Sequence, residues 1–116
     1  MPLRPLTCLV AAAVLCAAAC TPSGYDNCKS SCEAFQRCGY ANDTQAANCK
    51  TDCDHNQGKT ADDDATLARN CKNAGEIRSL QADCFHNVAC NSNVLSYTLA
   101  LAACVTDAQV NHCLKP

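Results

Sequence analysis

Apolar residues along this chain recur three or four positions apart and do not alternate in the two-residue period of a strand. Helical signals of this kind cover about residues 28–38, 44–57, 62–72, 77–88 and 94–108. The last segment is the clearest, because its apolar positions are spaced three, four, three and four residues apart: Val94, Tyr97, Leu101, Cys104 and Ala108. The pattern predicts a small all-α fold, a helical hairpin with two or three further helices.

Polar residues and glycines mark the expected helix ends. Gly39 and Gly58 are expected to end the first two helices, because glycine accepts the left-handed conformation that often follows a helix. Asp62, Asp63 and Asp64 would lie in the first turn of the third helix, where the helix dipole favours negative charge; a bound cation or basic partner is the alternative. The expected caps are Asp26 or Asn27, Asp43 or Thr44, Thr60, and Asn91 or Ser92.

Large aliphatic residues are missing from the first half of the expected domain. No Val, Ile, Leu or Met occurs in residues 20–66, and Phe35 is the only large purely apolar residue there. Without cross-links, this half has the composition of a disordered segment, but it carries five cysteines. We therefore expect disulfides to hold the first half. Apolar stripes should preserve helix around residues 77–106 even after partial reduction.

The first 19 residues have the pattern of an export signal. Arg4 precedes an apolar run from Leu6 to Ala19, which is shorter than the roughly 20 residues of a membrane-spanning helix. Ala17 to Ala19 fit the small-residue cleavage rule. Together with Cys20 they also resemble a bacterial lipobox, in which the cysteine is lipidated and becomes the first mature residue. We expect a signal peptide at 1–19, a lipid-anchored tether at 20–26 and a cysteine-rich helical domain at 27–116.

The number of cysteines bears on this interpretation. The chain has 13 cysteines in 116 residues, far more than a cytosolic protein keeps, so an oxidising compartment is expected. Residues 20–116 hold eleven of them, and lipidation of Cys20 leaves ten, an even number that can close five disulfides. Secretion without a lipid is the alternative, and it would leave an odd thiol.

Two Cys-x3-Cys pairs give the most specific spacing in the chain. Facing residues of an antiparallel helix pair have numbers with a constant sum, and both Cys28–Cys53 and Cys32–Cys49 add to 81. Each pair of cysteines also lies one turn apart on its helix. We therefore predict these two bridges. Residues 28–53 resemble the twin Cys-x3-Cys hairpin of small mitochondrial translocase chaperones and plant α-hairpinins, a likeness that covers this segment alone.

The remaining six cysteines allow fifteen pairings, and the sequence does not select one of them. The preferred set nests Cys90–Cys104 inside Cys84–Cys113 and joins the two halves through Cys38–Cys71. The overall layout of leader, lipobox-like cysteine and spaced cysteines resembles small cysteine-rich bacterial lipoproteins. That resemblance implies an envelope location and brings no assigned activity.

No metal site or cofactor is expected. Zinc knuckles usually have two or four residues between cysteines rather than three, and export favours disulfides over thiolates. Asp52, Asp54 and Asn56 begin like a calcium loop, but Gln57 stands where that loop requires glycine. His55, His86 and His112 lie on separate segments and are expected to be surface residues, and Asn42-Asp43-Thr44 is a glycosylation sequon of no consequence in a bacterial lipoprotein.

Charge and composition narrow the function. A formal net charge of −2, a pI near 5.8 and only five aromatic residues exclude a nucleic-acid footprint. No nucleophile or acid–base constellation can be named, so an enzyme is not expected. We expect a non-catalytic structural or interaction role in the bacterial cell envelope. A lipid on Cys20 would anchor the protein to a membrane, for which the outer membrane is the preferred choice. The identity of a protein partner is not indicated by the sequence. The alternative is a secreted disulfide-scaffold binding protein, an inhibitor or toxin-like effector.

Overall fold

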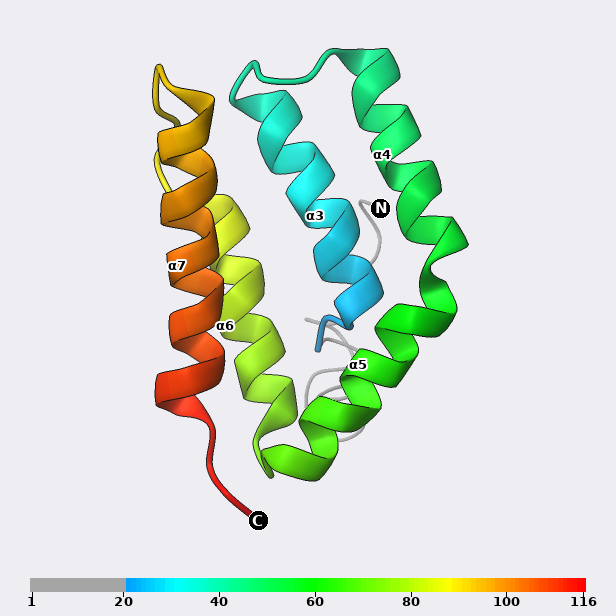
Figure 1. Ribbon diagram of the computed structural model, residues 1–116, viewed down its shortest axis with the longest axis vertical. Coiled ribbons are helices and arrows are strands. Elements are labelled where there is room, and N and C mark those ends of the chain that lie inside the picture. Colours follow the sequence, from blue (N-terminus) through cyan, green and yellow to red (C-terminus); the bar gives the residue numbers. More distant parts are fainter. Residues whose placement is uncertain (1–20) are drawn as a thin grey trace, which may run out of the picture.

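A computed structural model describes residues 21–116 and confirms the all-α prediction for this part of the chain (Figure 1). No strand occurs among these residues. The five helices are α3 (Gly24–Arg37), α4 (Asp43–His55), α5 (Gln57–Asn70), α6 (Ala74–Asn87) and α7 (Val94–His112). The expected signal peptide and Cys20 lie outside the described residues.

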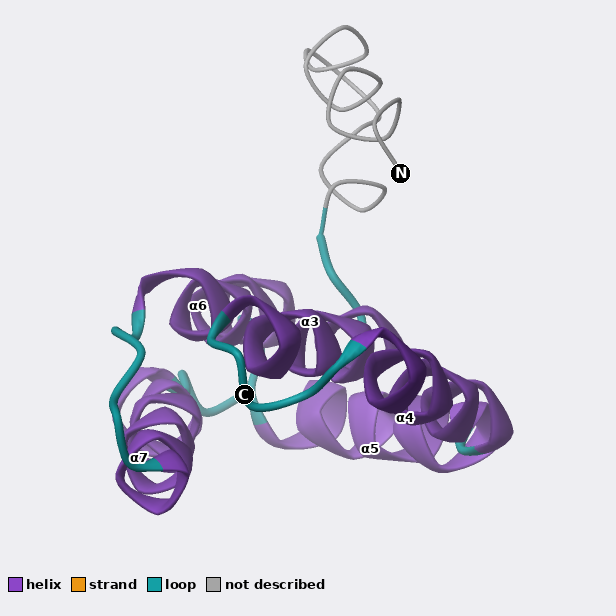
Figure 2. Ribbon diagram, turned by 90° about the horizontal axis from the view of Figure 1, so that it is seen from above, coloured by secondary structure: helices purple, strands orange, loops and turns teal. Residues whose placement is uncertain are grey.

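The helices form two layers, and α3 is the central element. Figure 2 shows α6, α3 and α4 side by side in one layer, with α5 and α7 in the other. α3 packs against α4, α5 and α6, whereas the principal neighbour of α7 is α6. α3 and α6 run in the same direction, and α4 and α7 run in the opposite one (Figure 1).

Most helices begin a few residues before the expected caps. Ser23, not Asp26 or Asn27, caps α3, in a reciprocal capping box where its side chain accepts from the Asp26 amide and Asp26 accepts from the Ser23 amide. Asn42 caps α4 in the same way with Gln45. Residues 24–26, expected in the tether, therefore belong to the helical domain. α7 begins after Asn93, which replaces the expected Asn91 or Ser92.

The two glycines behave differently. Gly39 follows the cap of α3 with a φ of +82°, so its predicted role in ending that helix is confirmed. Gly58 does not end the second helix but lies inside α5, because α4 ends at His55 and Asn56 is both the C-cap of α4 and the N-cap of α5. Since α5 begins at Gln57, Asp62, Asp63 and Asp64 lie in its middle rather than in its first turn, and Thr60 is not its cap.

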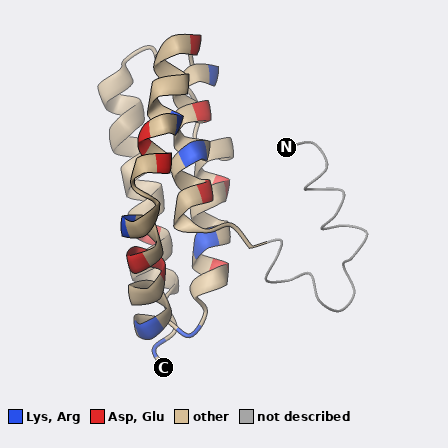
Figure 3. Cartoon of the chain, turned by 90° about the vertical axis from the view of Figure 1, so that its right-hand side faces the viewer, with Lys and Arg blue, Asp and Glu red and all other residues tan. Residues whose placement is uncertain are grey.

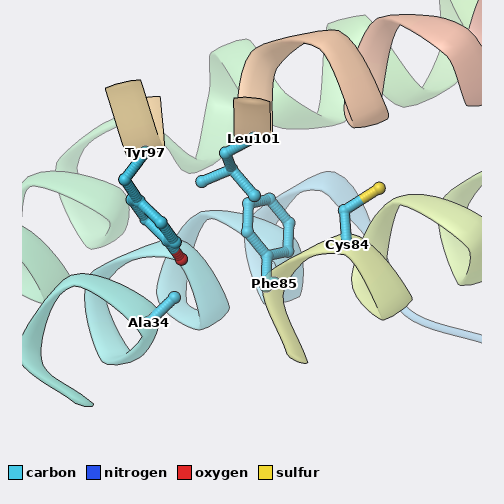
Figure 4. Packing of buried hydrophobic residues seen from close by; sticks show 5 residues of the cluster. All are labelled: Ala34, Cys84, Phe85, Tyr97 and Leu101. Atoms are coloured by element: carbon cyan, nitrogen blue, oxygen red, sulfur yellow. The ribbon is translucent and has the colours of Figure 1, made fainter. Parts of the chain in front are cut away.

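The main apolar core joins α3 to α6 and α7 (Figure 4). Tyr97 lies at its centre, and its ring packs edge-on against Phe35 and beside Tyr40, with centroid distances of 5.4 and 5.2 Å. The aliphatic half does not form this core alone, because α3 supplies part of the apolar contact. Five of its large side chains are exposed, and a second, smaller cluster of Leu67, Cys71 and Ile77 lies within it. The buried members of this core are Ala34, Cys84, Phe85, Tyr97 and Leu101.

α4 buries no large aliphatic or aromatic side chain. Ala46 and Cys53 are its only buried residues, and Cys53 is itself part of a bridge. Burying an alanine removes little apolar surface from water, so apolar packing alone cannot offset the entropy cost of ordering this helix. Disulfides hold α4 in place.

Replacing Cys28, Cys32, Cys49 and Cys53 with Ser should therefore release α4 selectively. Each lost bridge costs about 3 kcal/mol for loops of this size, and hydrogen exchange should show protection lost in residues 43–55 but retained in residues 77–101. The matched control is Cys71→Ser with Cys113→Ser, which should leave α4 protected. Equal loss of protection in α4 and α7 of the four-cysteine variant would contradict this account.

Candidate functional site

Two adjacent bridges join α3 to α4 and confirm the predicted pairs. Cys28–Cys53 and Cys32–Cys49 have Cα–Cα distances of 5.9 and 5.8 Å. Cys32 and Cys53, which belong to different bridges, are both buried, and their sulfur atoms lie 3.8 Å apart. The hairpin interface is therefore filled by sulfur where a longer domain would place aliphatic side chains.

The other six cysteines pair differently from the prediction. Among the described residues the bridges are Cys38–Cys90, Cys71–Cys113 and Cys84–Cys104. The predicted pairs Cys38–Cys71, Cys84–Cys113 and Cys90–Cys104 are therefore wrong. All ten cysteines of residues 21–116 are nevertheless paired with one another.

The position of the turn between α6 and α7 explains part of this error. The chain turns between Asn87 and Val94, and facing residues of the two helices have numbers that add to about 188, as Cys84 and Cys104 do. The Gln81 amide donates to the Val105 carbonyl at 3.3 Å in nearly the same register. The predicted pairs add to 197 and 194 and would place the turn inside α7.

The parallel direction of α3 and α6 explains the remaining part. The end of α3 meets the loop after α6, where Cys38 and Cys90 have a Cα–Cα distance of 5.4 Å and the Asn91 amide donates to the Tyr40 hydroxyl at 2.8 Å. Cys71 lies at the opposite end of the molecule, beside Cys113.

A polar network holds the start of α3 against α5 and α6. The Gly24 amide donates to both carboxylate oxygens of Asp64 at 3.0 and 3.1 Å, and Arg78 Nε donates to Asp64 at 2.8 Å. Arg78 also donates to Gln81 at 2.9 Å, and the buried Asn27 amide donates to the Arg78 carbonyl at 3.1 Å. A Cβ on Gly24 would lie 3.0 Å from Asp64 Oδ1, so a larger residue here would have to push the carboxylate away by a few tenths of an ångström.

The residues that directly follow Cys20 are packed on the domain. The methyl group of Thr21 lies over Gly75, where an added Cβ would be 3.1 Å from it. Thr21, Pro22 and Ser23 line a shallow pocket with Leu67 and Arg78. The chain therefore reaches the start of α6 one residue after the expected lipidation site, which itself lies outside the described residues.

A second polar cluster lies on the surface between α3 and α4. The Tyr25 hydroxyl donates to Asp54, and Lys29 forms an ion pair with Asp54 at 3.4 Å while its ammonium lies 4.5 Å from the centre of the Tyr25 ring. The Tyr25 hydrogen bond, followed by the Lys29 contact, lowers the pKa of Asp54 below its ordinary value. This cluster could not be expected from the sequence, because Asp54 lies 25 and 29 residues from its two partners.

The other candidate residues are dispersed or used within the fold. His55, His86 and His112 lie on three different helices, and the Asn42 side chain of the sequon caps α4. Asp52 and Asp54 belong to α4 rather than to a loop. Within residues 21–116, no three His, Cys, Asp or Glu side chains gather as metal ligands, and no helix is both long and apolar enough to span a membrane.

Comparison with known proteins returns no match: no family model, curated protein or solved structure is significantly similar to this chain. The fold itself defines the class of protein, a small all-α domain stapled by five disulfides. Such a number of bridges indicates an oxidising, extracytoplasmic compartment.

Replacing Asp64 with Ala should destabilise the domain, because the Gly24 amide and the Arg78 guanidinium both lose their partner. Hydrogen bonds to charged groups contribute about 1.5–3 kcal/mol, so we expect the free energy of unfolding to fall by about 2 kcal/mol in denaturant titrations. Asp63→Ala is the matched control, because Asp63 has only an exposed ion pair with Lys59 and should cost less than about 0.5 kcal/mol. Equal effects of the two variants would show that Asp64 does not hold α3.

Replacing Tyr25 with Phe should raise the pKa of Asp54 toward its ordinary value, because the largest cause of its lowering is removed. A carboxyl group with a lowered pKa in the folded state stabilises the fold above its unfolded pKa, and this contribution is lost as the pH falls through the folded pKa. The acid destabilisation due to Asp54 should thus be smaller in the variant. NMR titration of the Asp54 carboxyl carbon measures the shift. Tyr40→Phe, which removes a hydroxyl bonded to Asn91, should leave it unchanged.

Proposed function

We propose that this protein is a lipid-anchored component of a bacterial cell envelope with a non-catalytic structural or interaction role. The observation that carries the proposal is the complete pairing of the ten cysteines in residues 21–116. After removal of residues 1–19, Cys20 has no partner within the described domain. A lipid on its sulfur accounts for this odd cysteine in an oxidising compartment.

The position of Thr21 adds support to the anchor. Because Thr21 packs over Gly75, a lipid on Cys20 would emerge directly beside the start of α6. The tether expected at residues 20–26 is then only one or two residues long, since Ser23 already caps α3. The domain would be held close to the membrane and in a restricted orientation, as suits a protein that presents a fixed surface.

A structural or interaction role fits the way the polar side chains are used. Asp64, Arg78 and Gln81 bond to one another or to backbone groups of neighbouring helices, and Asp54 bonds to Tyr25 and Lys29. These groups serve to join helices of a rigid scaffold. Five bridges in such a small domain favour durability outside the cytoplasm over conformational change.

Replacing Cys20 with Ala should move the protein from the membrane fraction to the soluble fraction of a bacterial host and abolish incorporation of labelled palmitate. The lipid supplies the membrane affinity, because several acyl chains together anchor a protein stably. Cys16→Ala is the matched control, since it removes another cysteine of the leader and should change neither result.

A Cys20→Ala protein that stays in the membrane fraction, or a wild-type protein that is soluble and unlabelled, would overturn the anchor. A soluble wild type would instead support the secreted binding protein. The intact mass of the mature protein, before and after reduction, reports the cleavage site, the lipid and the number of bridges in one measurement.

A further inference from the structure

The two bridges of the α3–α4 hairpin touch each other through their buried sulfur atoms. Cys32 and Cys53 belong to different bridges, each is 1% exposed, and their sulfur atoms lie 3.8 Å apart. Their bridge partners, Cys28 and Cys49, are only partly buried. Each bridge therefore joins a cysteine near the surface to one in the interior, and the two interior cysteines are neighbours.

This contact couples the two bridges chemically. A disulfide exchanges when a thiolate attacks one of its sulfur atoms and releases the other as a new thiolate. A thiolate formed at Cys32 has the Cys53 sulfur of the other bridge beside it, and the reverse is equally true. We propose that partial reduction by a dithiol converts the two hairpin bridges into one buried bridge, Cys32–Cys53, and leaves the two thiols on Cys28 and Cys49.

The exchange begins when one thiolate of the dithiol attacks the Cys49 sulfur. A mixed disulfide forms there, and Cys32 leaves as a thiolate. The Cys32 thiolate attacks Cys53, forms the buried bridge and releases Cys28 as a thiolate. The second thiolate of the dithiol then attacks the reductant sulfur of the mixed disulfide, which releases Cys49 and closes the reductant into a cyclic disulfide.

The electrons and protons balance over these steps. The dithiol is oxidised by two electrons, the protein loses one of its two hairpin bridges, and the two protons of the dithiol pass through water to Cys28 and Cys49. Attack at Cys28 leads to the same product, because the released Cys53 thiolate then attacks Cys32 and frees Cys49.

Burial favours this product in two ways. A charge left on the Cys32 or Cys53 sulfur would lie in the interior, which is costly, whereas the exchange moves it to a cysteine nearer to water. Access is the second factor, because a reductant attacks a buried sulfur slowly. Either native bridge, when it remains alone, keeps one partly exposed sulfur, but the Cys32–Cys53 bridge keeps none. The buried bridge should therefore accumulate and resist further reduction.

The weak packing of α4 permits the movement that the exchange needs. The two interior sulfur atoms must approach from 3.8 Å to the roughly 2.05 Å of a disulfide bond. α4 buries no large side chain, and its polar contacts with α3 include two exposed ion pairs, Lys50 with Glu33 and Lys29 with Asp54. Figure 3 shows acidic and basic residues interspersed along the α4 and α5 side of the molecule. Exposed ion pairs contribute little, so α4 can shift against α3.

The first test removes one outer cysteine of the hairpin. The exported protein carries Cys20→Ala, so that neither a thiol nor a lipid at residue 20 takes part, together with Cys49→Ser. Cys32 then begins without a partner. After incubation at about pH 8, where roughly a quarter of ordinary thiols are ionised, most molecules should contain the Cys32–Cys53 bridge and a free thiol at Cys28.

The sequence allows a direct readout of the bridges. Acid stops the exchange, because it removes the thiolate, and the unfolded protein is labelled with N-ethylmaleimide at about pH 5. Trypsin then places the four hairpin cysteines on four different peptides, since Lys29, Arg37 and Lys50 lie between them. Mass spectrometry identifies which peptides are cross-linked and which carry the label.

Two further variants serve as a complement and a control. Cys28→Ser should yield the same buried bridge, with the label on Cys49. Cys113→Ser is the matched control, because Cys71 packs in a cluster where Cys113 is the other cysteine. Its label should stay on Cys71. Circular dichroism establishes that each variant keeps its helices.

Graded treatment with dithiothreitol tests the exchange in the protein that has all four hairpin cysteines. Hairpins with two free thiols should carry them on Cys28 and Cys49, and this result decides the proposal if Cys49→Ser does not fold. Free thiols paired as in the native bridges, or a folded Cys49→Ser protein labelled on Cys32, would overturn the exchange. Both tests use protein without a lipid, so their failure is distinguishable from a failure of the anchor.

Discussion

The rest of the structure depends on the fixation of α3 between α4, α5 and α6. This helix comes from the half of the chain that has almost no large apolar residues, yet it lies at the centre of the fold. Three kinds of interaction hold it: bridges to α4, the Asp64 and Arg78 contacts at its start, and Ala34 and Phe35 in the core. Covalent and polar contacts thus stand in for aliphatic burial, and the surrounding helices are arranged to supply them.

The features that local spacing determines were predictable from the sequence. Helical periods identified the five elements. The constant sum of residue numbers identified both hairpin bridges, because the two Cys-x3-Cys pairs lie on consecutive helices joined by one short turn. The other bridges depend on which helix ends meet in space. No local pattern states that α3 and α6 are parallel, so the pairing of Cys38 with Cys90 could not be derived. Asp64 was likewise visible only as one of three acids, and its contact with Gly24 spans 40 residues.

Among the candidate functional features, too, some follow from the sequence and others only from the structure. The prediction for Cys20 comes from the linear pattern of the residues before it, which requires no fold. The exposed side of α7, with Leu95, Leu99 and Val110, became apparent only from the structure, because the sequence does not reveal how much of this helix is covered. Val94, expected on the buried stripe, is 47% exposed, whereas Tyr97 and Leu101 are buried as expected. A helix that packs against the domain on one side only leaves its other side exposed.

The arrangement of the bridges along the chain has a consequence for resistance to proteases. Every peptide bond between Cys28 and Cys113 is enclosed by at least one disulfide loop, because the loops closed by Cys28–Cys53, Cys38–Cys90 and Cys71–Cys113 overlap in succession. One backbone cleavage in this stretch therefore leaves both fragments in a single covalent molecule. With Cys38–Cys71 and Cys84–Cys113 instead, residues 72–83 would be the one segment where a single cut separates the two halves. The observed linkage lets a nicked chain keep all of its parts.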